Sequence, residues 1–335
     1  MRLLTRQDFD GLACGSILEF LGIIDQWAFV TPADAQNGLV FATENDIVAN
    51  IPYIQGCGIW FDHHSSEIER LGKKFFENER PLLIPTRGFV SPDMLIKNQK
   101  TWEVIKISYK SPSCARIVYD YYLKTGKDLS RFLNLLEYVD KVDSGNLTID
   151  EILNPQGYVL LGFLVDSRTG LEKAQKYRTS SQDLIIRLSR VCSEYIEIED
   201  ILTLPYVKER VDAYNEYSAM YTELIKKHAR VDGNVIVLDL RGMDAVCVGN
   251  RFLLYSIFNK QNISVVISER KKKCNISVGY SIICQGPRAE VNVGSLMLKY
   301  AGGGHRRVGS CEVPIKGSDE VIKDIIQSCK MKSAV

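Results

Sequence analysis

The 335-residue chain lacks most of the features that mark membrane, secreted or nucleotide-cofactor proteins. No apolar run approaches the roughly 20 residues that span a bilayer, and Asp8 and Asp10 follow Met1 too closely for a secretory signal. The nine cysteines form no CxxC pair, so they indicate neither a disulfide framework nor a zinc ribbon. The absence of GxGxxG and GxxxxGK segments argues against dinucleotide-cofactor and Walker-type chemistry. We therefore expect a cytoplasmic protein without a membrane partner.

Charge is distributed unevenly along a chain whose total is close to neutral. The sequence has 42 Lys and Arg against 41 Asp and Glu, and 45% of its residues are hydrophobic, as in a folded globular protein. Residues 1–232 hold 27 basic and 33 acidic residues, a net of −6, whereas residues 233–329 hold 13 and 8, a net of +5. Two solvated surfaces would explain this split. A carboxylate-rich metal site in one domain and an anion-binding surface in the other would explain it equally well.

Short apolar runs alternate with helical patterns, which predicts an α/β protein with a mostly parallel N-terminal sheet flanked by helices. After this domain, we expect a linker helix and then a smaller C-terminal α/β domain. The expected domains are 1–204, 205–232 (the linker) and 233–330. Strands are expected at 2–5, 46–50, 58–61, 234–238, 263–268 and 275–282. Helices are expected at 11–21, 112–123, 130–142, 172–200, 206–230, 249–260, 292–300 and 318–329, with Ser111 and Pro112 starting the second.

Polar residues follow three of the predicted N-terminal strands. Asp8 and Asp10 come after the first strand, Asn50 after the second, and the Asp-His-His segment 62–64 after the third. Ligands of open parallel sheets bind beyond the carboxyl ends of the strands. We therefore expect these side chains to converge.

The Asp-His-His segment contains two of the four histidines of the chain, directly after the apolar residues 59–61. Asp62, His63 and His64 are consecutive residues of metal-ligating types. A carboxylate beside imidazoles suits Mn²⁺, Mg²⁺ or Fe²⁺ better than structural zinc. The simpler alternative is a pair of hydrogen-bonded histidines at a strand end.

A second cluster lies in the basic C-terminal part. Gly302, Gly303 and Gly304 precede His305, Arg306 and Arg307. Successive glycines let backbone N–H groups approach an anion, and the three side chains that follow add donors and positive charge. The alternative is a flexible surface loop.

Together these motifs resemble the DHH superfamily of phosphoesterases with a DHH-associated C-terminal domain. That group includes nanoRNases, cyclic-dinucleotide phosphodiesterases and exopolyphosphatase-related proteins. Residues 8–11 (Asp-Phe-Asp-Gly) resemble its first motif and 62–64 its signature, and 143–145 (Asp-Ser-Gly) resemble its fourth motif, with Asp140 as a competitor. Residues 302–305 resemble the substrate-binding motif of its C-terminal domain. The resemblance extends over roughly residues 1–325.

The resemblance implies hydrolysis by a metal-bound water, with two divalent ions, usually Mn²⁺, in the N-terminal domain. For this chain we expect Mn²⁺ or Mg²⁺, as one or two ions or none. The resemblance implies metal ligands at Asp8, Asp10, Asp62, His63 and Asp143. His64 would contact the ligands or the phosphate, and Asp62, His63 and His64 would form the catalytic group. It implies that the C-terminal domain holds the substrate across a cleft through Gly302, Gly303, Gly304, His305, Arg306 and Arg307.

Two residues depart from the family pattern. Arg6 stands where relatives usually have a histidine, and Asn50 where they have an aspartate that often bridges two ions. Arg cannot ligate a metal, and a neutral amide holds two cations poorly. Three outcomes stay open: a one-ion hydrolase, a two-ion enzyme completed by Asp46 or Asp140, and a site that binds without cutting. One hypothesis is that Arg6 replaces one cation electrostatically.

The sequence therefore predicts a divalent-metal-dependent phosphoesterase that acts on short oligonucleotides, a nucleotide or polyphosphate. The alternative is a non-catalytic nucleotide- or nucleic-acid-binding protein whose metal site is degraded and holds no ion. A third alternative is a structural homodimer whose cleft has lost its chemistry. The anionic oxygens of phosphodiesters and phosphoanhydrides are alike, so residues 302–307 do not distinguish these substrates.

Overall fold

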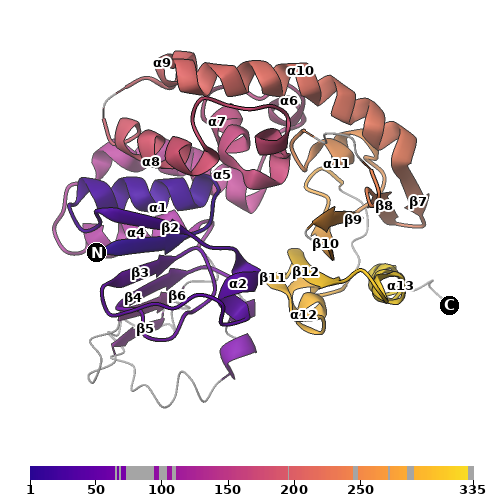
Figure 1. The fold of residues 1–335 in the computed structure, drawn as a ribbon, viewed down its shortest axis with the longest axis horizontal. Helices are drawn as coiled ribbons and strands as arrows, with labels where there is room; N and C mark the ends of the chain where they lie inside the picture. The colour runs from indigo at the N-terminus through magenta and orange to yellow at the C-terminus, as the bar shows by residue number, and fades with distance from the viewer. Residues whose placement is uncertain are drawn as a thin grey trace. The chain divides into compact units, whose positions relative to one another are not determined.

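The chain folds into two compact units (Figure 1). The first comprises Met1–Asn146, Pro155–Ser167 and Gln175–Ala213, and the second comprises Leu147–Asn154, Arg168–Ala174 and Tyr214–Val335. The computed structural model describes residues 1–64, 66–67, 69–72, 94–97, 104–107, 111–194, 196–243, 248–270, 272–284 and 290–330. Helix α10 (Pro205–His228) contributes its first residues to one unit and the rest to the other. The domain boundaries given above stay a prediction.

The N-terminal unit is built on a six-stranded sheet with the order β2-β1-β3-β4-β6-β5. Its strands are β1 (Arg2–Thr5), β2 (Gln26–Phe29), β3 (Asp46–Ala49), β4 (Ile59–Asp62), β5 (Met94–Lys97) and β6 (Val104–Ile107). Strand β5 runs antiparallel to β6, and all other neighbours are parallel. The predicted mostly parallel sheet is confirmed.

Helices cover both faces of this sheet. Those of the unit are α1 (Phe9–Phe20), α2 (Pro32–Gln36), α4 (Cys114–Leu123), α5 (Leu133–Ser144), α7 (Gly157–Val165), α8 (Ser181–Val191) and α9 (Ile198–Thr203). Trp60 of β4 packs in a cluster with Ala35 of α2, whereas the next residue, Phe61, contacts Tyr121 and Tyr122 of α4. Successive strand residues thus face opposite layers. Both layers are apolar, which explains the nearly continuous apolar strands of the sequence.

The C-terminal unit has a six-stranded mixed sheet with the order β11-β12-β10-β9-β8-β7. Its elements are β7 (Ala229–Asp232), β8 (Val235–Asp239), β9 (Ile263–Arg270), β10 (Lys273–Tyr280), β11 (Gly303–His305), β12 (Val308–Pro314), α6 (Ile149–Leu153), α11 (Leu253–Ile257), α12 (Val293–Leu298) and α13 (Ser318–Cys329). Among the described strand pairs of this second sheet, β8 and β9 run parallel and the others run antiparallel. Apolar residues of α12 and α13 pack on strands β8, β9, β10 and β12 to form the core. The predicted α/β class is confirmed for both units.

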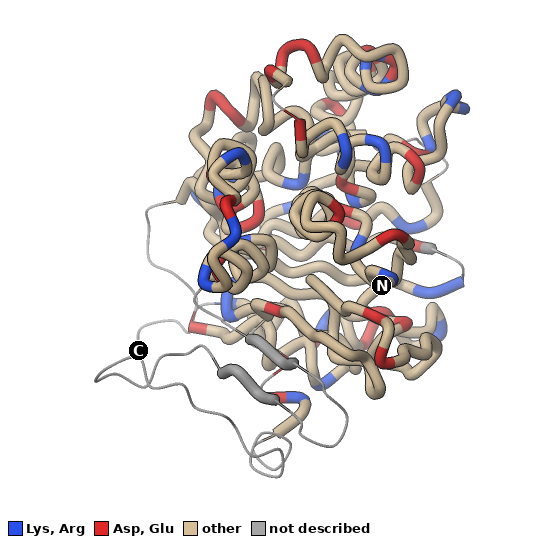
Figure 2. The backbone as a smooth tube through the Cα atoms, turned by 90° about the vertical axis from the view of Figure 1, so that its left-hand side faces the viewer, with Lys and Arg blue, Asp and Glu red and all other residues tan. Residues whose placement is uncertain are grey.

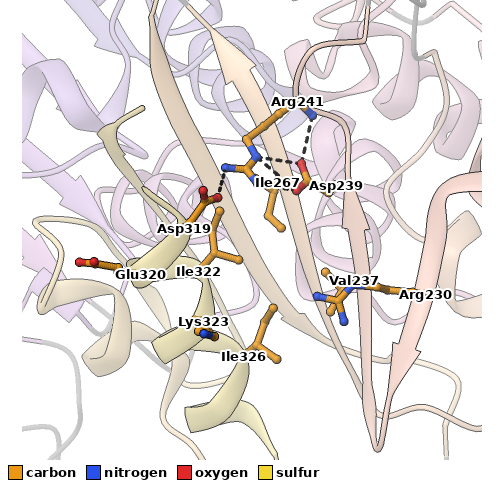
Figure 3. Close-up of a pocket in the computed structure, with 10 residues that line it drawn as sticks. All are labelled: Arg230, Val237, Asp239, Arg241, Ile267, Asp319, Glu320, Ile322, Lys323 and Ile326. Carbon is orange, nitrogen blue, oxygen red and sulfur yellow. Dashed lines mark hydrogen bonds and ion pairs between the residues drawn. The ribbon is translucent and has the colours of Figure 1, made fainter. Parts of the chain in front are cut away.

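A cavity of about 300 Å³ lies in the C-terminal unit beside α13 (Figure 3). Arg241 donates to Asp239 at the end of β8 and to Asp319 on α13, each at 2.7 Å. These carboxylates raise the pKa of the guanidinium. Because the Asp319 side chain is 84% exposed, solvent screens this link between helix and sheet, and its contribution to stability is small.

Several elements differ from the expected ones. The expected helix over 172–200 is interrupted: within its described residues α8 forms, and α9 begins at Ile198 and continues past the expected end. The helix expected over 249–260 is limited to α11. Ser113, not Ser111, caps α4, since its hydroxyl accepts from the Arg116 N–H at 3.1 Å. The glycine-rich segment is strand β11 and not a flexible loop, because it pairs with β12.

In Figure 2 the charged segments lie mostly on helices and loops, while the central strands are largely uncharged. None of the helices in the described part of the chain combines the length and apolarity needed to cross a bilayer.

Close packing at the centre of α1 yields a test of the fold. A Cβ on Gly15 would lie 1.7 Å from the Trp27 ring of β2. We expect Gly15→Ala to lower the free energy of unfolding by about 1–3 kcal/mol through overpacking, despite the better helix propensity of Ala, worth about 1 kcal/mol. Urea denaturation followed by circular dichroism measures this change.

The matched control is Gly15→Ala combined with Trp27→Phe. The smaller ring removes the overlap, and it also removes an indole N–H that is buried without a hydrogen-bond partner. The double variant should recover most of the lost stability. Wild-type stability of the single variant would contradict the packing described here.

Candidate metal centre

The ends of three parallel strands bring the predicted polar residues together in the N-terminal unit. In register, Thr5 of β1 lies opposite Ala49 of β3, and Ala49 lies opposite Phe61 of β4. The chain therefore leaves the sheet at one edge before Asp8, at Asn50 and at Asp62. The 2.9 Å hydrogen bond from Asn50 Nδ2 to Asp8 Oδ1 joins two of these segments.

Asp8 caps helix α1. Its Oδ1 accepts from the Gly11 N–H at 3.0 Å, and Arg6 Nε lies 3.3 Å from its Oδ2. Gly11 has no room for a side chain, because a Cβ would lie 2.1 Å from the Arg6 carbonyl oxygen. The turn between β1 and α1 therefore requires this glycine and places Arg6 beside Asp8.

Asp10, in the first turn of α1, is buried against the start of α4. Its Oδ1 accepts from the Ala115 N–H at 2.7 Å and its Oδ2 from the Cys114 N–H at 2.9 Å. Burial, together with the charges of Asp143 and Asp8, raises the pKa of Asp10 well above its usual range. The helix N-terminus opposes this shift by stabilising the anion.

His63 lies between two carboxylates. Its Nε2 is 3.6 Å from Asp10 Oδ2 and 3.4 Å from Asp143 Oδ2. Asp143 stands in the last turn of α5, just before Gly145, which ends the helix with φ 72°. One ligand atom from each of these three residues lies within 4.8 Å of the others, a geometry that suits a single metal ion.

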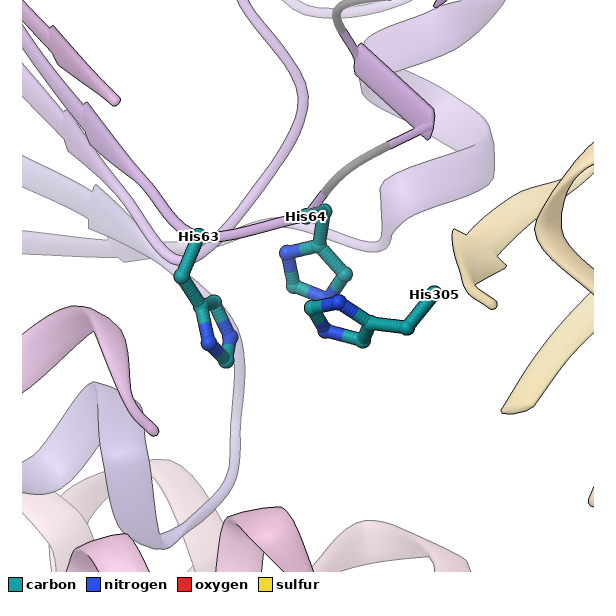
Figure 4. Close-up of side chains that lie close together, drawn as sticks. All are labelled: His63, His64 and His305. Carbon is teal, nitrogen blue, oxygen red and sulfur yellow. The ribbon is translucent and has the colours of Figure 1, made fainter. Parts of the chain in front are cut away.

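Asp62 ends β4 and pairs with His64, whose Nδ1 lies 2.7 Å from Asp62 Oδ1. Figure 4 shows His63 and His64 as successive residues beyond that strand. The other oxygen of Asp62, Oδ2, is buried without a hydrogen-bond partner. Burial raises the pKa of Asp62 to about 7 and lowers the pKa of His64 to about 3, the latter with help from His63.

Two carboxylates considered for completing the site lie elsewhere. Asp46 starts β3, at the opposite end of the strand from Asn50, and accepts from Arg2 at 2.7 Å. Asp140 accepts from Arg116 at 2.6 Å and from Ser113 at 2.6 Å. Each of these carboxylates is thus paired with an arginine, and neither belongs to the group formed by Asp10, His63 and Asp143 in the described residues.

The glycine motif lies in the C-terminal unit, where β11 and β12 form a hairpin whose turn is Arg306-Arg307. Both arginines are exposed, and His305, also labelled in Figure 4, is half-buried. A Cβ on Gly302 would lie 2.2 Å from the Ser310 carbonyl oxygen, and one on Gly304 would lie 2.3 Å from that of Val308. The hairpin itself thus explains two of the three glycines, and the motif presents its charge at the turn.

Sequence reasoning missed the two backbone N–H groups that hold Asp10, those of Cys114 and Ala115. The nearest signal was the helix start expected at 112, two residues early. A comparison of Ser111 with Ser113 as the cap would have placed these donors at the N-terminus of α4.

Solved structures supply a relative of this chain. It is similar to a pGpG-specific phosphodiesterase, PggH, from Vibrio cholerae, with 35% identity over 98% of each chain and a TM-score of 0.68. The chain belongs to the DHH superfamily of phosphoesterases. Neither the family models nor the curated protein sequences gave a match.

Two other structures resemble this DHH protein more weakly. An exopolyphosphatase-related protein from Bacteroides fragilis shares 14% identity over 98% of this chain and 91% of that one, with a TM-score of 0.46. RecJ from Thermus thermophilus, in complex with Mn²⁺, shares 12% identity over 98% of this chain and 51% of that one, with a TM-score of 0.49. Both scores are too low to inform the chemistry of this site.

The residues of this DHH protein fit a hard divalent cation. They supply carboxylate oxygens and one imidazole, the donors that Mn²⁺ and Mg²⁺ accept. The buried, unpartnered Asp62 Oδ2 would gain a partner in such an ion. A bound cation would also lower the pKa values that burial raises at Asp10 and Asp62. The set Asp10, Asp62, His63 and Asp143 is therefore a possible Asp/His metal site.

The two aspartates of α5 test this ligand set. We expect Mn²⁺ to raise the melting temperature of the wild-type protein. At a free Mn²⁺ concentration 100 times the dissociation constant, the folded state gains about 2.7 kcal/mol of stability. Asp143→Asn should largely lose this rise, whereas Asp140→Asn should keep it, because Asp140 is bound to Arg116. Differential scanning fluorimetry with and without Mn²⁺ makes the comparison. If Asp140→Asn lost the Mn²⁺-induced rise in melting temperature and Asp143→Asn kept it, Asp140 and not Asp143 would be the ligand.

Proposed function

We propose that this chain is a divalent-metal-dependent phosphodiesterase that cleaves the phosphodiester bond of a short linear dinucleotide such as pGpG. One observation carries the proposal: the 35% identity to a pGpG-specific phosphodiesterase extends over 98% of both chains. The compared region therefore spans both the N-terminal unit, with its carboxylate cluster, and the C-terminal unit, with its Gly-Gly-Gly-His-Arg-Arg hairpin. Polyphosphate and longer nucleic acids are the less favoured substrates.

In this proposal, Mn²⁺ or Mg²⁺ is held by Asp10, Asp62, His63 and Asp143. Such an ion lowers the pKa of a bound water and neutralises charge on the phosphate. The chain fixes its own groups for this task. The Cys114 and Ala115 N–H groups orient Asp10, and His64 orients Asp62 through Oδ1.

His64 has a further role in the proposed reaction. Because its pKa is lowered to about 3, the ring is neutral at pH 7. If Nδ1 donates to Asp62, then Nε2 carries no proton and can accept one from the attacking water. Asp62 and His64 would thus act as an orienting carboxylate and a general base.

The substrate phosphates are assigned to the β11–β12 hairpin. Arg306 and Arg307 place two positive charges at its turn, and arginine binds phosphate oxygens through two N–H groups. The Arg307 guanidinium lies 5.9 Å from the centre of the Tyr280 ring, which limits its freedom. Short substrates with a terminal phosphate would bind more tightly because of this positive charge.

The cytoplasmic location is also a proposal, supported by cysteine chemistry. The eight cysteines that the structure describes are buried thiols, as expected in a reducing compartment. A homodimer stays a prediction, which sedimentation would test.

Hydrolysis assays test the proposed activity. With Mn²⁺, we expect the wild-type protein to cleave pGpG faster than short RNA, phosphoadenosine phosphate or polyphosphate. The hydrolysis rate of Asp62→Ala should fall by more than the roughly 10- to 100-fold that is typical when a residue only supports a metal ligand. Chromatographic separation of the products gives the rates. Activity that persists in Asp62→Ala would refute the site, and tight pGpG binding without any cleavage would favour the non-catalytic alternative.

The hairpin arginines generate a separate expectation. Arg306→Ala should raise KM for pGpG by about tenfold, the loss of one charged hydrogen bond, with little change in kcat. Lys323→Ala on α13 removes a charge from the same unit and should leave KM unchanged. Steady-state kinetics distinguishes these results. An unchanged KM in Arg306→Ala would remove that residue from the substrate site.

A further inference from the structure

Asp8 is enclosed by protein donors on both of its oxygens. Oδ1 accepts the Gly11 N–H at 3.0 Å and Asn50 Nδ2 at 2.9 Å, while Oδ2 pairs with Arg6 Nε at 3.3 Å. Asp8 is only 4% exposed. A carboxylate in this setting acts as a helix cap and as a counter-ion to arginine.

The charge of Arg6 opposes a cation at the same carboxylate. Guanidinium keeps its proton at any pH at which the protein is folded. A divalent ion bound to Asp8 Oδ2 would therefore lie beside a permanent positive charge, in a partly buried site where the repulsion is weakly screened. The Arg6 side chain, which is part of the protein, thus places a fixed positive charge beside Asp8 where a metal ion would otherwise be needed.

Asn50 reinforces this arrangement from the adjacent strand end. Asp8 is an acceptor when ionised, so the amide must present Nδ2 to it and not its oxygen. The backbone of Asn50 has φ 61°, a left-handed conformation that Asn and Asp tolerate better than other side chains. An aspartate here would face Asp8 as a second negative charge, which a bound cation or protonation of one carboxyl would have to relieve.

Three of the other ligand candidates, Asp10, His63 and Asp143, converge without Asp8. His63 lies within 3.6 Å of both Asp10 and Asp143, and the unpartnered Asp62 Oδ2 belongs to the residue before His63. In the described part of the N-terminal unit, Asp46 and Asp140 are each paired with an arginine, which disfavours them as ligands of a second ion.

We propose that this chain binds one divalent ion, and that Arg6, locked to Asp8 and supported by Asn50, supplies the second positive charge of the site. The inference rests on the proposed metal-dependent function and deepens it, because it fixes the number of ions and assigns Arg6 a positioning and electrostatic role. The ion's ligands would be Asp10, Asp62, His63 and Asp143.

Manganese stoichiometry tests the inference without recourse to activity. Isothermal titration of the metal-free protein with Mn²⁺ should give one tight site per chain, and electron paramagnetic resonance should show the spectrum of an isolated ion. The double variant Arg6→His, Asn50→Asp should bind two ions per chain and show the spectrum of a spin-coupled pair. Two coupled ions in the wild-type protein would overturn the inference.

Two aspartate variants serve as matched controls. Asp8→Asn keeps an acceptor for Gly11 and Asn50 and should retain the single ion with less than about tenfold loss of affinity, whereas Asp10→Asn should lose it. Equal loss in both would place Asp8 among the ligands and contradict the inference. If the double variant does not fold, the wild-type stoichiometry and the comparison of Asp8→Asn with Asp10→Asn still test whether one ion binds without Asp8. Absence of Mn²⁺ binding in the wild-type protein would refute the proposed metal-dependent function itself, a result distinct from the binding of two ions.

Discussion

Burial of several carboxylates at one edge of the N-terminal sheet is the constraint on which the rest of this unit depends. A buried carboxylate is costly unless an opposite charge or directed N–H groups compensate it. Helix α1 therefore begins on Asp8, α4 begins against Asp10, and α5 ends beside His63. Three helices are thus fixed in position by the need to compensate charge, while the apolar faces of the strands fix the sheet beneath them.

Much of the fold followed from local patterns. The strands β1, β3 and β4 and the helices α1, α10 and α13 lay close to their expected ranges, because each has a strong apolar pattern or clear end signals. The edge strands β2, β7 and β11 were not expected, since each pairs with a single neighbour and owes its extended form to that pairing. Segment 172–200 was helical in composition, but its breaks depend on tertiary contacts.

The sequence predicted which residues gather at the site better than it predicted the contacts among them. Carboxyl ends of parallel strands meet at one edge, so the approach of Asn50 to Asp8 followed from the strand order. The sequence favoured Asp143 as the fourth-motif residue but kept Asp140 as a competitor, because three residues on a helix separate them by nearly one turn. Only the structure shows that Arg116 engages Asp140 and leaves Asp143 beside His63. The donors to Asp10 are backbone atoms, which carry no residue signature.

The central claim is that the carboxylate edge holds a single ion, with Arg6 as the permanent second charge. Anomalous diffraction at the manganese edge, from crystals grown with Mn²⁺, tests it most directly. We expect one anomalous peak per chain, bounded by Asp10, Asp62, His63 and Asp143, with Arg6 still paired to Asp8. Two peaks a few ångströms apart, or one peak against Asp8 with Arg6 displaced, would contradict the claim.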